Sequence, residues 1–325
     1  MYKMVKRVIK AAFRSLGLEV TKAKNIYGNN LDIIGEFIDS KGYKFHLLKG
    51  YRRMLWGFDW EGMNKDRSVP STETVRKLGY IRKGRDQVAD LVHFLSIYGL
   101  KVEGRDVLEV GCFDGAASYA LMEAGARCVH GIDHARGFIP SENPTDAEIT
   151  QQRDWLQALR DSVCLEFKRN SKACKPERVM FSDQDISNFI ETNKYDLLVS
   201  TVTLEHILNP RKAFKAMFDA LRPGGISFHN YHPFFCTSGA HFDTCDFPWG
   251  HVRLNNDDFR QYIRTFRPNE IDISEYRFFR TINRLTLTDL KEIALNTGFK
   301  VVDFYVSVDN WHDVTPVIYA QSKST

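Results

Sequence analysis

The sequence has no long hydrophobic run and no closely spaced pair of cysteines. None of its stretches approaches roughly 18 uninterrupted apolar residues, so no transmembrane helix is expected. Its first residues lack the apolar region and the small-residue cleavage site of a secretory signal. The six cysteines are scattered without a Cys-x-x-Cys pair, which argues against a zinc ribbon or a disulfide framework. These absences favour a cytoplasmic protein with free thiols.

Charge of one sign is also scarce. The 325 residues hold 45 Lys and Arg against 41 Asp and Glu, a net charge of +4, which excludes a polybasic nucleic-acid coat. Positive charge does gather in residues 1–16, where apolar residues recur at helical spacing. This basic amphipathic helix predicts either docking on the chain's own domain or peripheral contact with the inner membrane face.

Strands and helices alternate from residue 84 onward. Short apolar runs predict strands, and the amphipathic stretches between them predict helices. The predicted strands are 106–111, 128–133, 179–186, 195–204 and 226–232. The predicted helices are 84–100, 116–125, 145–172, 209–225 and 286–299. This order predicts an α/β fold, with a Rossmann-like, doubly wound sheet of parallel strands.

Two segments depart from the alternation. Residues 233–285 are rich in Phe, Asp, His and Arg, and an insertion of this length predicts a cap or lid. Residues 300–309 and 314–323 are expected to pair as antiparallel strands across a short turn. We therefore expect an N-terminal helical extension over 1–80, followed by one main domain over 81–325 that carries the lid.

A turn containing glycine follows the first predicted strand. Glu109 ends this strand, Gly111 and Gly115 flank the turn, and Asp133 ends the next strand. Glycine allows the backbone to approach a ligand closely, and the start of the following helix offers free N–H groups. An acidic residue at the second strand end can accept two ribose hydroxyls. The segment predicts binding of either a dinucleotide or an adenosyl group.

The same segment resembles the first motif of the class I S-adenosylmethionine-dependent methyltransferases, acidic-x-Gly-x-Gly-x-Gly. Glu109, Gly111 and Gly115 match this motif, and Phe113 stands in place of the middle glycine. The resemblance implies S-adenosylmethionine as the cofactor.

The resemblance extends over about 85–235 and 286–325. Within it, the turn Leu-Glu-His follows the 195–204 strand, and Leu-Arg-Pro-Gly-Gly ends the helix after that turn. The terminal pair of antiparallel strands is also typical of the family. The fold that the resemblance implies is a seven-stranded sheet with an antiparallel last strand.

The resemblance also implies which residues hold the cofactor. Asp133 would bind the ribose, Asp185 and Ile186 would lie at the adenine, and Arg85 or Arg82 would pair with the carboxylate. Glu109 would orient the glycine loop or accept from the ammonium group. Asp185 has an alternative role as a helix N-cap, and Arg85 as a solvated helix residue. The whole implied set is Arg85, Glu109, Gly111, Phe113, Gly115, Asp133, Asp185, Ile186 and Thr201.

Histidine is concentrated where the methyl acceptor of such an enzyme would bind. Five of the ten histidines lie between 206 and 251, namely His206, His229, His232, His241 and His251. One interpretation is a general base for an alcohol acceptor, supplied by His206, His232 or His241. A second is a metal site formed by His241, Asp243, Asp246 and His251, and a third is a structural role in the lid. The spacings match no metal pattern, so no metal is predicted.

The segment after the fourth strand narrows the type of acceptor. Residues 200–203 read Ser-Thr-Val-Thr, without the Asn/Asp-Pro-Pro-Tyr tetrapeptide of nucleic-acid amino-methylating enzymes and without a Pro-Cys pair. No nucleic-acid partner is therefore expected. The insertion carries aromatic residues that suit a sugar ring or an apolar small molecule: Phe234, Phe235, Phe242, Phe247 and Trp249.

Together these features predict O-methylation of a saccharide or of another small-molecule hydroxyl. The acceptor would be a small molecule or a glycan, including a lipid-linked unit in polysaccharide biosynthesis. A non-catalytic adenosyl-binding partner subunit is the alternative, which the substitution at Phe113 favours. A nicotinamide-dependent oxidoreductase is disfavoured, because its Gly-x-Gly-x-x-Gly motif differs from the Gly111-x-x-x-Gly115 spacing here.

Overall fold

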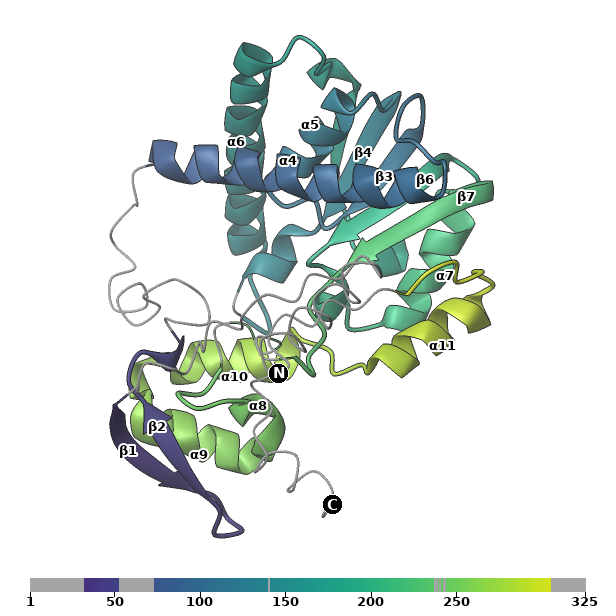
Figure 1. The fold of residues 1–325 in the computed structure, drawn as a ribbon. Coiled ribbons are helices and arrows are strands. Elements are labelled where there is room, and N and C mark those ends of the chain that lie inside the picture. The colour runs from purple at the N-terminus through teal and green to yellow at the C-terminus, as the bar shows by residue number, and fades with distance from the viewer. Residues whose placement is uncertain are drawn as a thin grey trace, which may run out of the picture.

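The computed structural model describes residues 32–52, 73–139, 141–236, 239, 241 and 244–304. They form a core domain built on a sheet and a smaller domain beside it, drawn below the core in Figure 1. The predicted amphipathic helix at 1–16 lies outside the described residues. Among the residues that are described, no helix combines the length and apolar character needed to cross a membrane.

The core domain is organised around a parallel sheet. Its strands are β3 (Asp106–Val110), β4 (Cys128–Asp133), β5 (Val179–Asp183), β6 (Tyr195–Thr201) and β7 (Leu221–Asn230). Their order is β5-β4-β3-β6-β7, and every neighbouring pair is parallel. Val107 and Leu108 of β3 are fully buried. A strand buried on both faces needs a continuous apolar run, which explains why these segments lack polar alternation.

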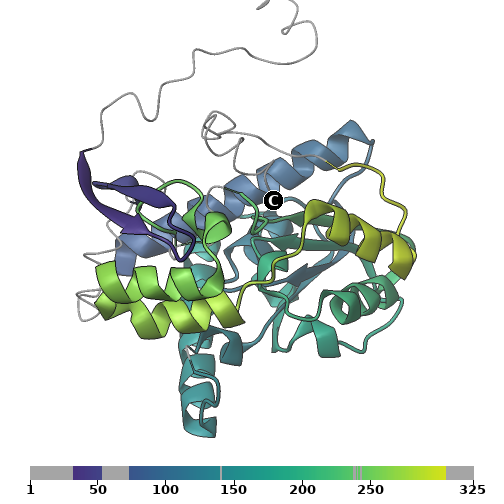
Figure 2. The same ribbon diagram turned by 90° about the horizontal axis from the view of Figure 1, so that it is seen from below.

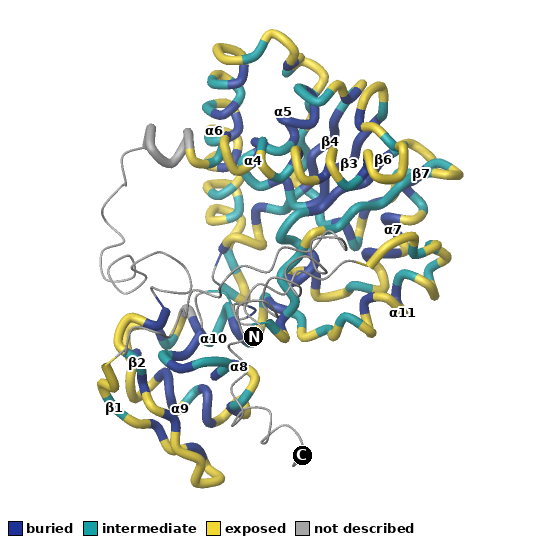
Figure 3. The backbone as a smooth tube through the Cα atoms, in the orientation of Figure 1, coloured by how far each residue is buried: buried dark blue, intermediate teal, exposed yellow. Residues whose placement is uncertain are grey.

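Helices cover both faces of this sheet, as Figure 1 shows. One apolar layer joins the sheet to α4 (Glu73–Ile97), α5 (Ala116–Glu123) and α6 (Asp146–Asn170). The opposite layer joins it to α7 (Pro210–Ala220) and α11 (Leu287–Thr297). Figure 3 shows the buried residues between these layers. The predicted Rossmann-like α/β arrangement is confirmed over this part of the chain.

Short 3-10 turns connect the main elements. They are η1 (Ala135–Phe138), η2 (Pro176–Arg178), η3 (Ile186–Asn188), η4 (Leu204–His206) and η6 (Pro268–Glu270). Thr286 caps the N-terminus of α11 and forms a reciprocal capping box with Asp289.

The sheet differs from the expected one at its C-terminal edge. The described sheet has five strands, and residues 300–304, where a strand was expected to begin, form none. The expected antiparallel strand at 314–323 lies outside the described residues. The helix predicted for 209–225 is also too long. It ends at Ala220, because Pro223 lacks an N–H group and the chain already pairs with β6 at Leu221.

The smaller domain combines two segments that are far apart in sequence. Its hairpin consists of β1 (Ile33–Ile38) and β2 (Lys44–Leu48), which pair antiparallel. Its helices are α8 (Gly250–Arg253), α9 (Asn256–Phe266) and α10 (Ile271–Arg280). Figure 2 shows the hairpin beside these helices. The prediction of a purely helical extension over 1–80 is therefore wrong for 33–48, where alternating buried residues favour strands.

Aromatic packing and buried charge hold the two segments together. Phe37 and Phe45 of the hairpin share one apolar cluster with Phe247 and Tyr262. Arg52 donates two hydrogen bonds to Glu270, at 3.2 and 3.1 Å, and all of these groups are buried. Breaking one side of such a pair leaves an uncompensated buried charge, which is strongly destabilising. The hairpin is therefore an integral part of the smaller domain.

We expect the smaller domain to depend on the stacked pair Phe259 and Phe278. Their ring centroids lie 3.9 Å apart at an interplanar angle of 9°, and both side chains are fully enclosed. Phe259→Ala should lower the free energy of unfolding by about 3–5 kcal/mol. Denaturant unfolding measures this, with Phe304→Ala, at a residue 40% exposed, as the control. Equal losses in the two variants would contradict the packing described here.

Candidate active site

The candidate site lies where the strand order reverses. The chain runs outward from β3 to β4 and β5, then returns to the other side of β3 with β6 and β7. In open α/β sheets, ligands bind outside the carboxyl ends of the strands at this switch point. The loop after β3, residues 111–115, and the turn after β6, residues 202–207, meet at this place.

The loop after β3 requires glycine at two positions. Gly111 and Gly115 have φ values of 81° and 76°, a backbone conformation that favours glycine. A Cβ atom at Gly111 would lie 2.1 Å from Oγ1 of Thr203, and one at Gly115 would lie 2.6 Å from the Phe181 ring. The loop after β3 therefore packs directly on the turn after β6.

Phe113 takes the place of the motif's middle glycine without losing its backbone function. Its φ is 37°, and its N–H donates to Oδ2 of Asp133 at 2.9 Å. Arg160 of α6 donates from Nε to the Phe113 carbonyl at 2.9 Å. The ring packs against Phe138 and Trp155, with centroids 5.3 and 6.1 Å away. These contacts hold a non-glycine residue in a left-handed conformation.

Asp133 has acceptor capacity for a ribose. Its two carboxylate oxygens each accept one backbone N–H, from Phe113 and His134, both at 2.9 Å. An ionised carboxylate has about four lone-pair sites, so about two remain for neighbouring hydroxyls. The residues present therefore fit the adenosyl group that the resemblance implies.

Glu109 lies beneath the glycine loop. It is 5% exposed and accepts a hydrogen bond from the Ser118 hydroxyl. Burial raises its pKa to about 8, the bond from Ser118 opposes this rise, and the charges of Asp114 and Asp133 add to it. The carboxyl group is therefore mostly protonated at neutral pH in the ligand-free chain.

The predicted role of Arg85 receives no support from the structure. Its guanidinium donates two hydrogen bonds to Glu123, at 2.8 and 2.7 Å, in the last turn of α5. This carboxylate lies at the opposite end of α5 from the glycine loop, so the ion pair draws Arg85 away from the cofactor. Burial raises the pKa of Asp114 in the glycine loop, and the charge of Lys83, which is exposed on the same helix as Arg85, opposes this rise.

Three further predicted residues lie at the ends of β5 and β6. Asp185 accepts from the Ser187 N–H at 2.7 Å and thereby caps η3, as its alternative role predicted. Ile186 is buried next to it. Thr201 ends β6, and its carbonyl accepts from the Thr203 hydroxyl at 3.1 Å. Contact of Asp185 and Ile186 with adenine, and of Thr201 with the cofactor, stays a prediction.

The structure brings together the three histidines that were predicted as bases. The rings of His206 and His241 stack with centroids 5.0 Å apart, and His232 lies 6.2 Å from His241. Glu205 joins them, with Oε1 at 3.7 Å from Nε2 of His241. We call these four residues the His–Glu cluster. Glu205 was not among the predicted site residues, although its place beside His206 in the turn after β6 was a signal that could have identified it.

The other two histidines of the 206–251 segment lie elsewhere. His229 bonds to the hydroxyls of Ser200 and Ser227, and His251 faces the carbonyls of Phe234 and Cys236. Asp246 accepts from the Tyr262 hydroxyl, and residue 243 lies outside the described residues. Among the described members of the metal site considered from the sequence, His241, Asp246 and His251 do not form a metal-binding group with one another.

Burial governs the electrostatics of the His–Glu cluster. Glu205 is fully enclosed, and burial raises its pKa to about 7. Burial, together with the neighbouring His206 and His232, lowers the pKa of His241 to about 3. Burial also lowers the pKa values of His206 and His232. The imidazoles are neutral at neutral pH, so their nitrogen lone pairs are available to a proton or a ligand.

Asn283 fixes the turn that carries Glu205 and His206. Its side-chain amide donates to the carbonyls of Leu204 and Ile207 at 2.6 and 2.9 Å. Its backbone N–H donates to the Glu205 carbonyl at 2.8 Å. Asn283 lies in the segment that connects α10 to α11. This connection from the smaller domain to the core domain therefore holds the turn after β6 in place.

Two of the five residues of the predicted aromatic wall belong to an internal core, and Trp249 is half-buried. Phe234 and Phe247 are 3% and 2% exposed and belong to the apolar cluster of the smaller domain. Phe235 is exposed, and residue 242 lies outside the described residues. The smaller domain needs these rings to build a core, so they do not support a sugar-binding surface.

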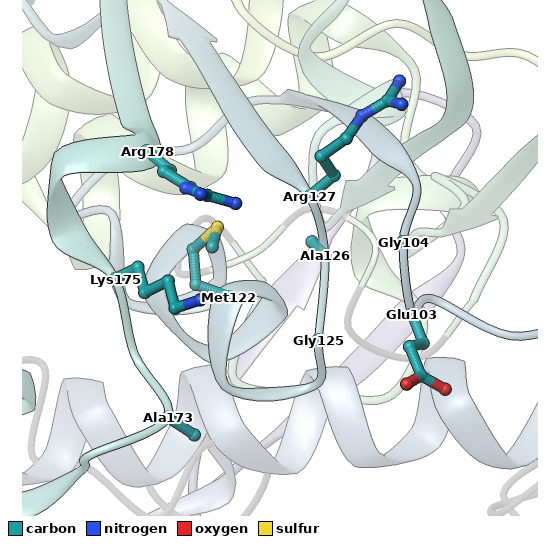
Figure 4. A pocket seen from close by; sticks show the side chains of 9 residues that line it. All are labelled: Glu103, Gly104, Met122, Gly125, Ala126, Arg127, Ala173, Lys175 and Arg178. Atoms are coloured by element: carbon teal, nitrogen blue, oxygen red, sulfur yellow. The ribbon is translucent and has the colours of Figure 1, made fainter.

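A cavity of about 290 Å³ lies away from this site (Figure 4). It is lined by Met122 of α5 and by residues of the connections that lead into β3, β4 and β5: Glu103, Gly104, Gly125, Ala126, Arg127, Ala173, Lys175 and Arg178. These loops lie at the amino ends of the strands, opposite the glycine loop. The cavity is therefore separate from the candidate active site.

Glu109 generates a prediction about stability. The folded-state pKa of Glu109 lies above the ordinary value of 4.5, so the stability that its protonated form contributes is fully present below about pH 4.5 and is lost as the pH rises through about 8. Between these pH values, the free energy of unfolding of Glu109→Gln, relative to that of the native chain, should rise by up to about 1.4 kcal/mol per pH unit. Chemical denaturation at several pH values measures the difference. The exposed Glu292→Gln is the control, and a constant difference for Glu109→Gln would contradict the prediction.

Comparison with known proteins identifies the family. A family profile described as a methyltransferase domain matches residues 80–303. The ubiquinone biosynthesis O-methyltransferase of Shewanella sp. (strain ANA-3) is 28% identical over 125 residues, which are 38% of this chain and 42% of that protein. The protein of the same name from Pseudomonas fluorescens (strain Pf0-1) is 24% identical over 216 residues, or 65% and 77% of the two chains.

The chain thus spans less than half the length of the first of these relatives. An S-adenosylmethionine-dependent methyltransferase structure from Mesorhizobium loti has 16% identity and a TM-score of 0.39, covering 68% of this chain and 87% of that chain. The family profile covers well over half of the sequence and includes both the glycine loop and the His–Glu cluster. The chain therefore belongs to the methyltransferase domain family, among the class I S-adenosylmethionine-dependent methyltransferases.

Proposed function

We propose that the protein transfers a methyl group from S-adenosylmethionine to a hydroxyl group of a small molecule. One observation carries this proposal. The cofactor loop and the His–Glu cluster are adjacent, because Gly111 packs on Thr203 only two residues before Glu205. Neutral imidazoles next to a methyl donor suit an acceptor that must lose a proton.

S-adenosylmethionine supplies an electrophilic methyl group on a sulfonium. The chain's residues then have to align the acceptor oxygen with that methyl group and to remove the hydroxyl proton. His232 suits the second task. Its Nδ1 atom is buried and has no hydrogen-bond partner among the described residues, so it can accept a proton. The oxygen–carbon bond forms as the carbon–sulfur bond breaks, and the sulfur leaves as a neutral thioether.

The named relatives support a hydroxyl as the acceptor. Both are called O-methyltransferases of ubiquinone biosynthesis. A saccharide acceptor, a lipid-linked acceptor and membrane contact through residues 1–16 are more specific proposals about the same methyl transfer. Of these, the saccharide has less support than the sequence suggested, because Phe234 and Phe247 are core residues.

A non-catalytic adenosyl-binding subunit is the second candidate. It would retain the glycine loop and Asp133 but would not need the His–Glu cluster. Cofactor binding without methyl transfer to any hydroxyl acceptor would favour it. Measuring the affinity for S-adenosylmethionine and, separately, the turnover of a hydroxyl acceptor distinguishes these two candidate functions.

The first prediction concerns the glycine loop. In Gly111→Ala the new Cβ would displace either the loop or Thr203, so the affinity for S-adenosylmethionine should fall at least about tenfold. Titration calorimetry measures the change. Gly104→Ala is the matched control, because Gly104 has a φ of 74° with open space around its Cβ position and lies away from the site. If the native chain does not bind S-adenosylmethionine, the proposed function is overturned.

The second prediction concerns His232. Once an acceptor is found by mass spectrometry of a panel of hydroxyl compounds, His232→Ala should lower kcat by about 10²–10⁴-fold with unchanged cofactor affinity. Because burial lowers the pKa of His232 below its usual 6.5, native kcat should stay level near pH 7 and fall only in more acidic solution. The exposed His93→Ala is the control. Near-native turnover of His232→Ala would exclude His232 as the base.

A further inference from the structure

We propose that Glu205, His206 and His241 bind one divalent transition-metal ion, such as Zn²⁺, between the two domains. The turn after β6 supplies Glu205 and His206, and the inserted segment supplies His241. This set differs from the His241, Asp243, Asp246 and His251 set considered from the sequence, of which it keeps only His241.

The spacing of the ligand atoms fits such an ion. One nitrogen or oxygen atom from each of the three residues lies within 4.8 Å of the others. The shortest measured pair joins Oε1 of Glu205 to Nε2 of His241, at 3.7 Å. Two ligands of a tetrahedral zinc ion, at about 2.0–2.1 Å from the metal, lie about 3.3 Å apart. Side-chain shifts of about 1 Å would therefore complete the site.

His206 is held in the tautomer that a metal ligand needs. Its Nδ1 lies 3.0 Å from the carbonyl oxygen of Thr281, which can only accept, so Nδ1 carries the hydrogen. The lone pair is then on Nε2. Histidine ligands of metals commonly donate their other ring N–H to a backbone carbonyl, which fixes the orientation of the ring.

The burial of Glu205 is an independent observation in favour of a cation. Its carboxylate is fully buried and accepts no hydrogen bond from a side chain of the described residues, and only the backbone N–H groups of Glu205 and His232 lie near it as donors. A buried carboxyl group with so few donors is costly unless it binds a proton or a cation. His241 faces the same carboxylate from a backbone φ of 51°, a conformation that is strained for any residue other than glycine. Strain of this kind is typical of functional sites.

The donor set indicates the class of metal. Two imidazole nitrogens and one carboxylate suit zinc, iron, cobalt or nickel, whereas magnesium and calcium prefer oxygen ligands. Three protein ligands also leave a coordination position open, as catalytic zinc sites do. If the proposed function holds, the acceptor hydroxyl would occupy that position, where the metal lowers its pKa before His232 takes the proton.

The test measures metal binding alone, without cofactor or acceptor, so that its outcome is independent of the proposed function. The full chain is freed of metal with a chelator and titrated with Zn²⁺ by calorimetry and with Co²⁺ by visible absorption. We expect one ion per chain and a Co²⁺ spectrum typical of nitrogen and oxygen coordination at low symmetry. His206→Ala removes a metal ligand and should weaken binding by more than about 10–100-fold, because a change at a group that only orients a ligand already costs that much.

Two further variants make the test specific. Glu205→Gln keeps the shape of the side chain and should also weaken binding, while thermal melting checks that each variant is folded. His93→Ala removes an exposed histidine far from the cluster in sequence and should leave the affinity unchanged. The proposal is overturned if the native chain binds no Co²⁺, or if His206→Ala and His93→Ala bind it equally. Methyl transfer by a chain that binds no metal would overturn this inference and leave the proposed function intact.

Discussion

The arrangement of the candidate site depends on the hydrogen bonds of Asn283. Its side-chain amide and backbone N–H together satisfy the carbonyls of Leu204, Glu205 and Ile207. A short turn after a strand has few backbone partners of its own, and buried carbonyls must find donors elsewhere. Since those donors come from the segment that leaves the smaller domain, the position of Glu205 is set by both domains at once.

The same interaction explains why the smaller domain is more than a cover. It contributes His241 and the Thr281 carbonyl to the His–Glu cluster. The sheet supplies the glycine loop and Asp133, which need only local backbone geometry. The His–Glu cluster needs contacts between segments distant in sequence.

This division also explains what the sequence could predict. The strands around Val107 and the turn at Gly111 follow from apolar runs and glycine spacing, which are local signals. His206, His232 and His241 were selected as alternative bases because histidine is concentrated in that part of the sequence, and in the structure the rings of His206 and His232 both lie near that of His241. Their role as a base stays a prediction. The hairpin at 33–48 and the pairing of Arg85 with Glu123 could not be predicted, because both depend on long-range packing.

The ion pair between Arg52 and Glu270 has a consequence for biosynthesis. Its partners are separated by 218 residues, and the entire sheet is encoded between them. During translation from the N-terminus, the hairpin must wait for the sheet and for α9 and α10 before it finds its partners. Long-range contacts of this kind form slowly, and waiting strands expose unpaired edges. The smaller domain is thus the part of the chain whose maturation most needs protection in the cell.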